Sequence, residues 1–269
     1  MHKISAVLIT YNEATIIAKT LEHLLWCDEI VVVDSGSTDE TVQICEKFGC
    51  KVYDKKFEGY GTQKQFAVAC ATNDWILSID ADEIVTPNLQ IEIQNLIKLD
   101  NLTELSRIKA FNIPRSLIFM QRKLRFGGEY RNLQLRFFHR KHANFNDLTI
   151  HESVVLQNIQ NKNELNINHL VIGKLKNEIL HDSYKNIEDY FNKLNRYTSL
   201  AADKLFQQQK RQILIILMFR LPFDFFYKYI FQGLIFDGFS GFIWALFSSI
   251  YPIVKYAKLE EMWRKMEKK

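Results

Sequence analysis

The stretch DWILSIDADE, residues 74–83, places an acidic cluster directly after a short apolar run. The run from Asp74 to Ile79 has the composition of a buried strand. Asp80 and Asp82 follow where the chain leaves that strand, so both carboxylates can reach one ligand. Hard divalent cations such as Mg²⁺ and Mn²⁺ take carboxylate oxygens. We therefore predict a divalent-cation site here, although an isolated Asp-x-Asp also occurs in ordinary turns.

Upstream of this stretch, short β-rich runs alternate with segments of helical periodicity. Ile4–Thr10, Glu29–Asp34 and Cys50–Tyr53 have the character of buried parallel strands. Apolar residues at three- and four-residue steps predict helices between the strands, and Pro87 stands near the start of a further helix. This alternation predicts an α/β fold with a mostly parallel sheet that is flanked by helices on both faces.

Polar clusters follow three of the predicted strands, at Thr10–Glu13, Asp34–Asp39 and Asp80–Glu83. Each cluster alone would be a turn or a helix cap, and Ser37 with Glu40 has the spacing of a capping box that opens a helix. Ligands of open parallel sheets bind beyond the carboxyl ends of the strands. Because all three clusters fall at that edge, we predict that they form one binding site.

The pattern changes after about residue 101. Strands are predicted at 110–119, 133–139 and 149–156, and the sequence becomes helical from about His181. Apolar residues between Ile187 and Leu205 recur at three- and four-residue steps, which predicts a long amphipathic helix. We divide the chain into residues 1–100 and 101–180, two halves of one domain, and a helical C-terminal region, residues 181–269.

Composition is that of an ordinary globular chain of 269 residues, with 47% apolar residues, 25% charged residues and a formal charge of +4. Such a length can bury a substantial core. The four cysteines show no CxxC pair and no zinc-ligand spacing, so buried thiols in a reducing compartment are expected. The start MHKISAVLITYNE lacks the pattern of a signal peptide, and we expect a cytoplasmic location.

The last third of the chain is unusually apolar and aromatic. Residues 213–219 read ILIILMF, and 229–257 are apolar apart from Asp237 and several glycines. Neither run offers about twenty uninterrupted apolar residues, the usual length of a spanning helix. Cations flank both runs, as in helices that lie in a membrane interface. We predict interfacial contact; a re-entrant segment or a buried helical hairpin is the alternative. The flanking cations are Lys210, Arg211, Arg220, Lys228, Lys255 and Lys258.

As a set, AVLITYNE (6–13), VVVDSGSTDET (31–41) and DWILSIDADE (74–83) resemble the donor domain of glycosyltransferase family 2, the inverting enzymes with a GT-A fold. The match covers roughly residues 4–100 in order and spacing. Gly59-Tyr60-Gly61 with Gln63-Lys64, then Ile150-His151-Glu152, and finally DGFSGF and KYAKLEE extend it to nearly the whole chain. These later segments resemble lipopolysaccharide-core glucosyltransferases of the WaaE/KdtX type.

This resemblance implies that residues 1–100 bind a nucleotide-sugar donor and that 101–180 form the acceptor side of the same catalytic domain. Asp34 would hydrogen-bond the base, Asp80 would lie near the ribose or the metal, and Asp82 would be the principal metal ligand. His181 is a further candidate for the metal or the diphosphate. The donor-binding residues implied are Thr10, Tyr11, Asn12, Glu13, Asp34, Lys64, Asp80 and Ala81.

An inverting transfer needs a base that removes the proton of the acceptor hydroxyl. In the family this base is an Asp or Glu downstream of the donor domain. The resemblance therefore implies Glu152, in TIHES, as the catalytic base; an exposed surface glutamate is the alternative. Its neighbour His151 could orient it or contact phosphate.

The segment from Arg115 to His142 is rich in cations and contains Glu129 as its one acid. A solvated basic face is the ordinary interpretation. A phosphorylated, lipid-linked acceptor at an anionic bilayer is the better motivated partner, since each nearby cation contributes about 1 kcal/mol of attraction. Nucleic acid is not expected, because no nucleic-acid-binding module accompanies the charge.

The predicted function is an inverting, metal-dependent transfer of a sugar, with glucose from UDP-glucose as the expected donor, onto the lipopolysaccharide inner core. The protein is expected to be peripheral, on the inner face of the cytoplasmic membrane. The alternatives are a family-2 transferase with another donor or a polyprenyl-phosphate or other lipid acceptor, or a non-catalytic sugar-nucleotide-binding membrane protein. A nucleotidyltransferase is disfavoured, because TYNEA after the first strand lacks glycine.

Overall fold

The computed structural model describes residues 2–98, 108–146, 153–156, 171–211 and 214–267. The chain forms two compact units. The sheet unit comprises Met1–Arg115 and Arg131–His181, and the helical unit comprises Ser116–Tyr130 and Asp182–Lys269. Residues 116–130, expected from the sequence to belong to the second half of the sheet domain, group instead with the C-terminal helices.

The sheet unit is built around a mixed sheet whose strand order is β3-β2-β1-β4-β8-β6-β12-β5. The first four strands of this order are parallel, and β8 is antiparallel to both β4 and β6. A separate hairpin is formed by β9 and β10. The strands are β1 (Ile4–Thr10), β2 (Glu29–Asp34), β3 (Lys51–Asp54), β4 (Trp75–Ser78), β5 (Glu83–Val85), β6 (Ile108–Phe119), β7 (Arg122–Lys123), β8 (Asn132–His139), β9 (Ala143–Phe145), β10 (Val154–Leu156), β11 (Val171–Lys174) and β12 (Ile179–His181).

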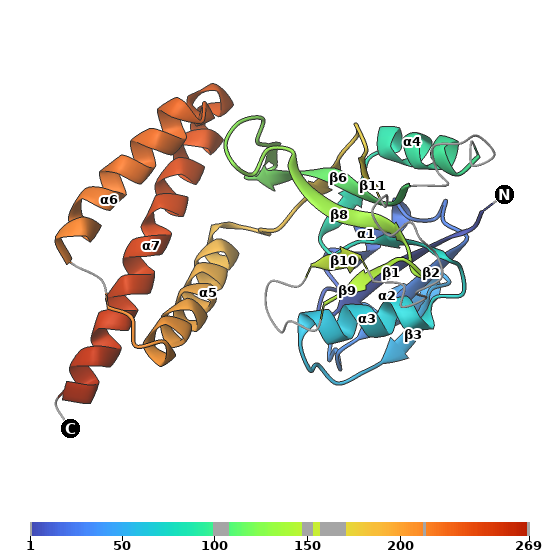
Figure 1. Ribbon diagram of the computed structural model, residues 1–269, viewed down its shortest axis with the longest axis horizontal. Helices are drawn as coiled ribbons and strands as arrows, with labels where there is room; N and C mark the ends of the chain where they lie inside the picture. The colour runs from blue at the N-terminus through green and yellow to red at the C-terminus, as the bar shows by residue number, and fades with distance from the viewer. Residues whose placement is uncertain (1, 99–107, 147–152, 157–170, 212–213, 268–269) are drawn as a thin grey trace, which may run out of the picture. The chain divides into compact units, whose positions relative to one another are not determined.

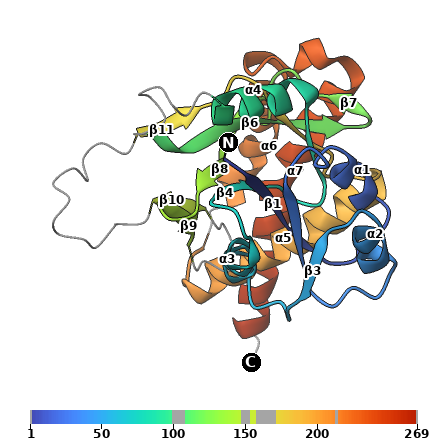
Figure 2. The same ribbon diagram turned by 90° about the vertical axis from the view of Figure 1, so that its right-hand side faces the viewer.

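Helices cover both faces of the parallel strands, and Figure 2 shows α3 on one side of β1 with α1 and α2 on the other. Alternate side chains of β1 supply the two cores. Ala6 and Leu8 pack in the core that includes Leu21, while Val7 packs in the core that includes Val68. The predicted helix-flanked α/β fold is therefore confirmed. The helices of this unit are α1 (Ile17–Glu22), α2 (Thr41–Lys47), α3 (Tyr60–Cys70) and α4 (Pro87–Lys98).

The predicted capping box is wrong. The helix α2 begins at Thr41, four residues after Ser37, and its first N–H is capped by Asp39, whose Oδ1 accepts from Thr41 N at 3.0 Å. The hydroxyl of Ser37 is engaged elsewhere, because it donates to Asp34 Oδ1 at 2.5 Å. The spacing of Ser37 and Glu40 cannot show whether Ser37 or Asp39 caps the helix, since both side chains can accept from the same backbone N–H groups.

A buried carboxylate links the amino-terminal ends of the parallel strands by hydrogen bonds. Glu29, at the start of β2, accepts hydrogen bonds from the Ser5 hydroxyl, from Lys51 Nζ at 2.6 Å and from Thr72 N at 2.8 Å. Burial alone would raise the pKa of Glu29, but the hydrogen bonds from Lys51, Ser5 and Thr72 outweigh it and lower the pKa to about 2. This carboxylate therefore stabilises the fold in its ionised form.

Glu29→Gln is expected to lower the free energy of unfolding by about 2 kcal/mol at neutral pH. Because the pKa of Glu29 is lower in the folded than in the unfolded chain, its stabilisation is fully present above the ordinary value of 4.5 and is lost as the pH falls toward 2. Urea unfolding of both proteins should therefore show a difference that narrows under acid conditions. Glu58→Gln, at an exposed pair with Lys55, is the control. A pH-independent difference would contradict this account.

The helical unit contains three long helices, which Figure 1 shows side by side. The longest, α7, packs against both α5 and α6. Leu117, Phe119 and Leu124 share a core with Tyr190 and Ala245 of the helices. The elements are α5 (Ile187–Gln207), α6 (Leu214–Phe226), the π-helical turn η2 (Tyr227–Phe231), the 3₁₀ turn η3 (Leu234–Asp237) and α7 (Gly238–Glu267).

The stretch Leu234–Glu267 is the one helix, among the described residues, that is long and apolar enough by length and composition to cross a membrane. About a third of its most apolar window is buried within the protein. Gly241 is needed where α7 meets the preceding turn, because a Cβ there would lie 2.0 Å from the carbonyl oxygen of Leu234. The helix is therefore built to pack closely at its amino-terminal end.

All four cysteines are free thiols, as the sequence predicts, but Cys27, Cys50 and Cys70 are only partly buried. Cys45 is fully buried. Burial raises the pKa of Cys50 to about 11, so this thiol is protonated at neutral pH.

Candidate active site

The first two polar clusters meet at the carboxyl ends of β1 and β2. Thr10 is paired with Asp34 in the parallel register, and its hydroxyl donates to Asp34 Oδ1 at 3.0 Å. The next residues are held in the same way: Asn12 N donates to Ser37 Oγ at 2.8 Å, and Glu13 N donates to Thr41 Oγ1 at 2.8 Å. The structure therefore brings these two predicted clusters together.

Asp34 organises the loop that follows β2. Its carboxylate accepts from the hydroxyls of Thr10 and Ser37 and from the backbone N–H groups of Gly36 and Ser37. A carboxylate has about four lone-pair sites, so these bonds use its full capacity. The base contact predicted for Asp34 therefore requires that one of these bonds be exchanged for a bond to the ligand.

Residues 11 and 12 present different groups at this edge. The side chain of Tyr11 is 58% exposed, so its ring is accessible to a ligand. Asn12 has a left-handed backbone, with φ of 55°, and its Oδ1 accepts from Thr38 N at 2.8 Å. Because an asparagine adopts this conformation more readily than most residues, Asn12 fits the tight turn between β1 and the helix that follows.

The third cluster lies beside the first, because β4 pairs with β1 and Ile79 N donates to Val7 O at 3.1 Å. Asp80 follows directly. Lys64 Nζ, from α3, lies 2.8 Å from Asp80 Oδ1, and the guanidinium of Arg136, from β8, pairs with the other oxygen. Burial alone would raise the pKa of Asp80, but the charges of Arg136 and Lys64 hold it well below its usual value.

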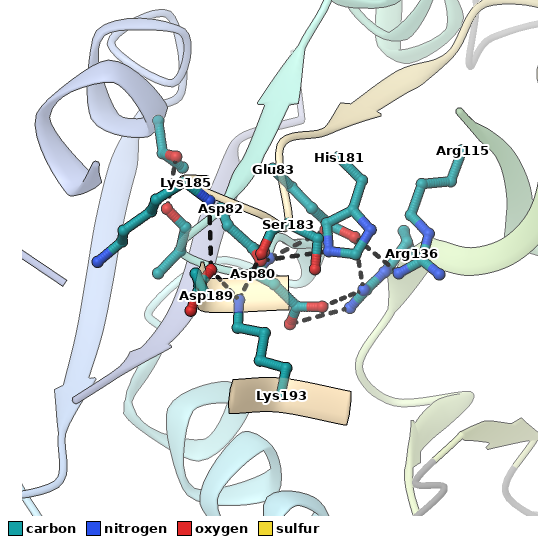
Figure 3. A network of polar contacts seen from close by, with 12 residues as sticks. Asp80, Asp82, Glu83, Arg115, Arg136, His181, Ser183, Lys185, Asp189 and Lys193 are labelled. Atoms are coloured by element: carbon teal, nitrogen blue, oxygen red, sulfur yellow. Dashed lines mark hydrogen bonds and ion pairs between the residues drawn. The ribbon is translucent and has the colours of Figure 1, made fainter. Parts of the chain in front are cut away.

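Glu83 fixes the turn that carries Asp80 and Asp82. Its Oε2 accepts from Asp80 N at 3.0 Å, and its Oε1 lies 2.9 Å from Arg136 Nη2 and 3.3 Å from Arg115 Nη1 (Figure 3). The side chain of Glu83 is fully buried. Because a buried carboxylate needs compensating charge, the two arginines and Glu83 hold this turn in place together.

Sequence reasoning missed Arg136 as part of the site and included Glu83 only as the last member of the Asp80–Glu83 cluster. Arg136 was grouped with the general basic segment, and Glu83 was assigned no role of its own. A signal was present, because Arg136 interrupts the apolar run of a predicted strand, NLQLRFFH. A cation among buried strand residues indicates a paired carboxylate nearby, since unpaired charges are rarely buried.

Asp82 lies beside His181. The strand β12 pairs with β5, opposite Glu83, and this places His181 Nε2 at 3.2 Å from Asp82 Oδ2 (Figure 3). Burial alone would lower the pKa of His181, but the carboxylate of Asp82 raises it. The carbonyl of Ala81, which precedes Asp82 in the sequence, accepts from Thr20 Oγ1 at 2.7 Å, and this bond anchors the turn to α1.

The donor set at Asp82 fits a divalent cation that is shared with a ligand. Among the described residues, no three His, Cys, Asp or Glu side chains form a metal cluster by themselves. Mg²⁺ in phosphate-handling sites is commonly held by one or two carboxylates together with substrate phosphates and water. Asp82 would supply such a carboxylate, and His181 would supply a ring nitrogen once the cation has displaced its proton, with a diphosphate ligand completing the coordination.

Glu152 and His151 lie outside the described residues, so the base predicted at Glu152 stays a prediction. The residues that follow are described. Val154 pairs with Phe145 in the β9–β10 hairpin, and Ser153 O accepts from Asn146 N at 3.0 Å. The ring of Phe145 lies under Lys64 Nζ, 5.4 Å from its centroid. Residues 153–156, which follow Glu152, therefore belong to a hairpin that contacts Lys64, the ion-pair partner of Asp80.

The basic segment predicted to face an acceptor is divided between the two units. Arg115 and Arg136 are paired with carboxylates at the strand ends, and Lys141 pairs with Asp74 at 3.0 Å. Arg122 and Arg125 belong to the helical unit. The division falls within β6, which begins in the sheet unit and ends in the helical unit, so the acceptor contact of this segment stays a prediction.

Arg136→Ala is expected to destabilise the sheet unit by about 3 kcal/mol, since it leaves the buried Glu83 and the neighbouring Asp80 with less compensating charge. Urea unfolding followed by circular dichroism measures this effect. Lys141→Ala is the matched control: it also breaks an ion pair, but the Lys141 side chain is 68% exposed, so a loss below about 1 kcal/mol is expected. Equal losses for the two variants would refute the role assigned to Arg136.

Comparison with known proteins identifies the class of this α/β chain. The profile of the family described as Glycosyl transferase family 2 matches residues 5–154. An uncharacterized glycosyltransferase of Rickettsia felis is 35% identical over 268 residues, which cover 97% of this chain and 90% of that protein. The chain therefore belongs to glycosyl transferase family 2.

A more specific likeness is to the lipopolysaccharide core biosynthesis glycosyltransferase LpsC of Rhizobium meliloti. It is 30% identical over 263 residues, which cover 95% of this chain and 91% of LpsC. Solved structures are more distant. TarS of S. aureus has a TM-score of 0.46 at 17% identity and covers 74% of this chain and 39% of its own. A glucosyl-3-phosphoglycerate synthase from Mycobacterium tuberculosis, in complex with Mn²⁺, UDP and glucosyl-3-phosphoglycerate, has a TM-score of 0.35 at 24% identity and covers 44% of each chain.

Proposed function

We propose that this glycosyltransferase moves a hexose, glucose from UDP-glucose in the first instance, onto the inner core of lipopolysaccharide with inversion at the anomeric carbon. The observation that carries the proposal is the arrangement at the strand ends. There Asp80 is held between Lys64 and Arg136, and Asp82 lies 3.2 Å from His181. Carboxylates that can hold a cation thus lie beside cations that can bind a phosphate.

The charges of this arrangement suit a nucleotide diphosphate. Lys64 and Arg136 are both nearly buried, and they offer N–H donors whose present partner is a carboxylate. Arginine and lysine bind phosphate oxygens in the same way as carboxylate oxygens. When bound, a divalent cation would neutralise the negative charge on the departing diphosphate. In this proposal Asp82 and His181 hold the cation, and Asp80 hydrogen-bonds the ribose.

The nucleoside would lie against Thr10, Tyr11, Asn12 and Glu13. The exposed ring of Tyr11 offers a surface on which a base can stack. The loop that Asp34 organises lies directly alongside, because Thr10 and Asp34 are hydrogen-bonded. Support for this placement comes from the family profile, which spans residues 5–154 and therefore includes all of these positions.

Glu152 is the proposed base. Its following residues are attached to Phe145, whose ring contacts Lys64 Nζ. A carboxylate at this position would take the proton of the acceptor hydroxyl as that oxygen attacks the sugar opposite the departing diphosphate. Because attack comes from the face opposite the leaving group, the product has inverted configuration at the anomeric carbon.

The acceptor is proposed from the likeness to LpsC, which extends along 95% of this chain. A lipopolysaccharide precursor is lipid-linked and anionic, so the transfer would take place at the inner face of the cytoplasmic membrane. A polyprenyl-phosphate acceptor is the second candidate, since it is also a lipid-linked anion. The long apolar stretch Leu234–Glu267 supports a lipid-linked acceptor of either kind.

A donor screen tests the proposal. Thermal unfolding is measured with UDP-, GDP- and ADP-sugars, with and without Mn²⁺, and the best donor is then incubated with delipidated inner-core oligosaccharide. We expect UDP-glucose with Mn²⁺ at about a hundred times its dissociation constant to raise Tm by roughly 5 °C. Mass spectrometry should then show the addition of one hexose to the oligosaccharide. Stabilisation by another nucleotide sugar alone would refute the proposed donor, and the absence of any transfer would refute the acceptor.

A further inference from the structure

The helical unit exposes a set of aromatic side chains that a soluble surface does not require. We define the aromatic face as Phe219, Phe223, Tyr227, Phe231, Phe236 and Phe239, whose exposed fractions lie between 47% and 80%. At about 200 Å² for each large side chain, this face exposes roughly 800 Å². The largest apolar patch of a soluble monomer is usually about 300–600 Å². The summed exposed area of these six side chains is therefore larger than the usual largest patch.

The aromatic face is an ordered feature rather than a scatter of rings. Its first four members recur every four residues through α6 and η2, so they follow one side of the helix. The rings of Phe223 and Tyr227 are stacked at 6.1 Å between centroids, and those of Tyr227 and Phe231 at 6.2 Å. The remaining two members follow the turn at Gly233, where η3 contacts η2. The six members thus extend from α6 through η2 and η3 to the first turn of α7.

Cations adjoin the aromatic face. A hollow of about 170 Å³ is lined by Arg122, Lys123, Arg125, Phe236 and Asp237, so it joins the face to three positive charges. Asp237 is the one acid among these lining residues. Its carboxylate accepts from the backbone N–H groups of Arg125 and Phe126, each at 3.0 Å, and it thereby fastens the basic loop to η3. The hollow therefore keeps a net positive charge next to exposed rings.

We propose that the aromatic face inserts into the headgroup region of an anionic lipid bilayer, with Arg122, Lys123 and Arg125 bound to lipid phosphates at its border. Aromatic rings favour the boundary between headgroups and acyl chains, and arginine and lysine near an anionic surface add attraction. The combination of a large aromatic surface with adjoining cations fits a bilayer better than a protein partner. The six rings supply the apolar contact and the loop supplies the charge complementarity.

Contacts along α7 favour insertion of this face over a helix that crosses the membrane. Lys258 Nζ, within α7, lies within 2.9 Å of four acceptors, the carbonyl and Oδ1 of Asn195 and the hydroxyls of Thr198 and Ser199, which its three N–H groups share. These acceptors belong to α5, whose outer side carries exposed polar residues such as Arg196. Because α5 packs along α7, a spanning α7 would carry exposed polar side chains of α5 into hydrocarbon, which is costly. The helices therefore lie on the bilayer, with the aromatic face toward the lipid.

This inference extends the proposed function, because a lipid-linked acceptor lies in the same bilayer, but its test does not depend on transfer. The full-length protein is sedimented with vesicles of phosphatidylcholine that contain roughly 30 mol% phosphatidylglycerol. Phe223→Ser/Phe231→Ser/Phe236→Ser should weaken binding at least about tenfold, since three exposed rings no longer enter the interface. The control Leu25→Ser/Ile91→Ser alters exposed apolar residues of the sheet unit and should bind like the unaltered protein.

A second pair of variants tests the contribution of positive charge to vesicle binding. Arg122→Gln/Arg125→Gln should abolish the preference for anionic over neutral vesicles, whereas Arg196→Gln should preserve it. Unaltered binding by the triple serine variant, or absence of binding by the unaltered protein, would overturn the proposal. A dimer in analytical ultracentrifugation that the triple variant dissolves, without vesicle binding, would assign the face to a second copy instead. Retained transfer to soluble oligosaccharide by the triple variant separates this test from the transferase test.

Discussion

Asp82→Asn is expected to reduce sugar transfer by on the order of 10³-fold, because it removes the proposed carboxylate ligand of a cation that stabilises the departing diphosphate by several kcal/mol. The substitution preserves size and removes one charge. His181, at 3.2 Å from Asp82, cannot replace the lost oxygen by itself. The loss is expected mainly in kcat, since the charge on the leaving group is greatest in the transition state.

Two measurements make this prediction specific. Calorimetric titration with UDP should show Mn²⁺-dependent binding to the unaltered protein, and this dependence should disappear in Asp82→Asn. Asp203→Asn, at an exposed carboxylate on α5, should behave like the unaltered protein in both assays. Full activity of Asp82→Asn would show that Asp82 is not a metal ligand. Lost activity with a lower free energy of unfolding would instead indicate that Asp82 is needed for the fold of the turn.

Glu152→Gln should retain donor binding and lose turnover by about 10²–10⁴-fold, because the amide cannot accept the proton of the acceptor hydroxyl. The measurement is kcat with saturating donor and acceptor, together with calorimetric titration of the nucleotide sugar. Glu261→Gln, at an exposed glutamate of α7 that pairs with Lys265, is the control and should leave both quantities unchanged.

The two readouts for Glu152 separate the possible roles of this residue. Loss of donor binding would show that Glu152 contacts the donor rather than the acceptor. Unchanged turnover would show that the base lies elsewhere in the chain. A further test is the pH profile: if Glu152 is the base, the limb of kcat that falls toward low pH in the unaltered protein should be absent in the glutamine variant.

Much of the fold follows from local sequence because the parallel strands are short, buried and separated by clear helix signals. Ile4–Thr10 and Glu29–Asp34 are strands over the predicted residues. Their polar ends could be placed together from topology alone, since neighbouring parallel strands share one carboxyl edge. The same reasoning brought Asp80 to that edge, where β4 lies beside β1.

The remaining features depend on contacts between residues that are distant in sequence. Arg136 reaches Asp80 and Glu83 because β8 pairs antiparallel with β4, and nothing in the local pattern fixes that pairing. The loop with Arg122 and Arg125 joins the helical unit through Asp237, more than a hundred residues away. Asp34 differs again, since the carboxylate that is expected to bind a base accepts four hydrogen bonds from Thr10, Gly36 and Ser37. Competition among hydrogen-bond acceptors of this kind is decided only by the folded backbone.

The central claim is that the ends of β1, β2 and β4 form the donor site. Hydrogen–deuterium exchange tests it most directly, with the protein alone and with Mn²⁺ plus the nucleotide sugar that stabilises it most. Our account predicts slower exchange at residues 10–13, 34–41 and 78–83 when the donor is bound, and no such change in Asp82→Asn. Protection confined to other segments, or equal protection in Asp82→Asn, would contradict it.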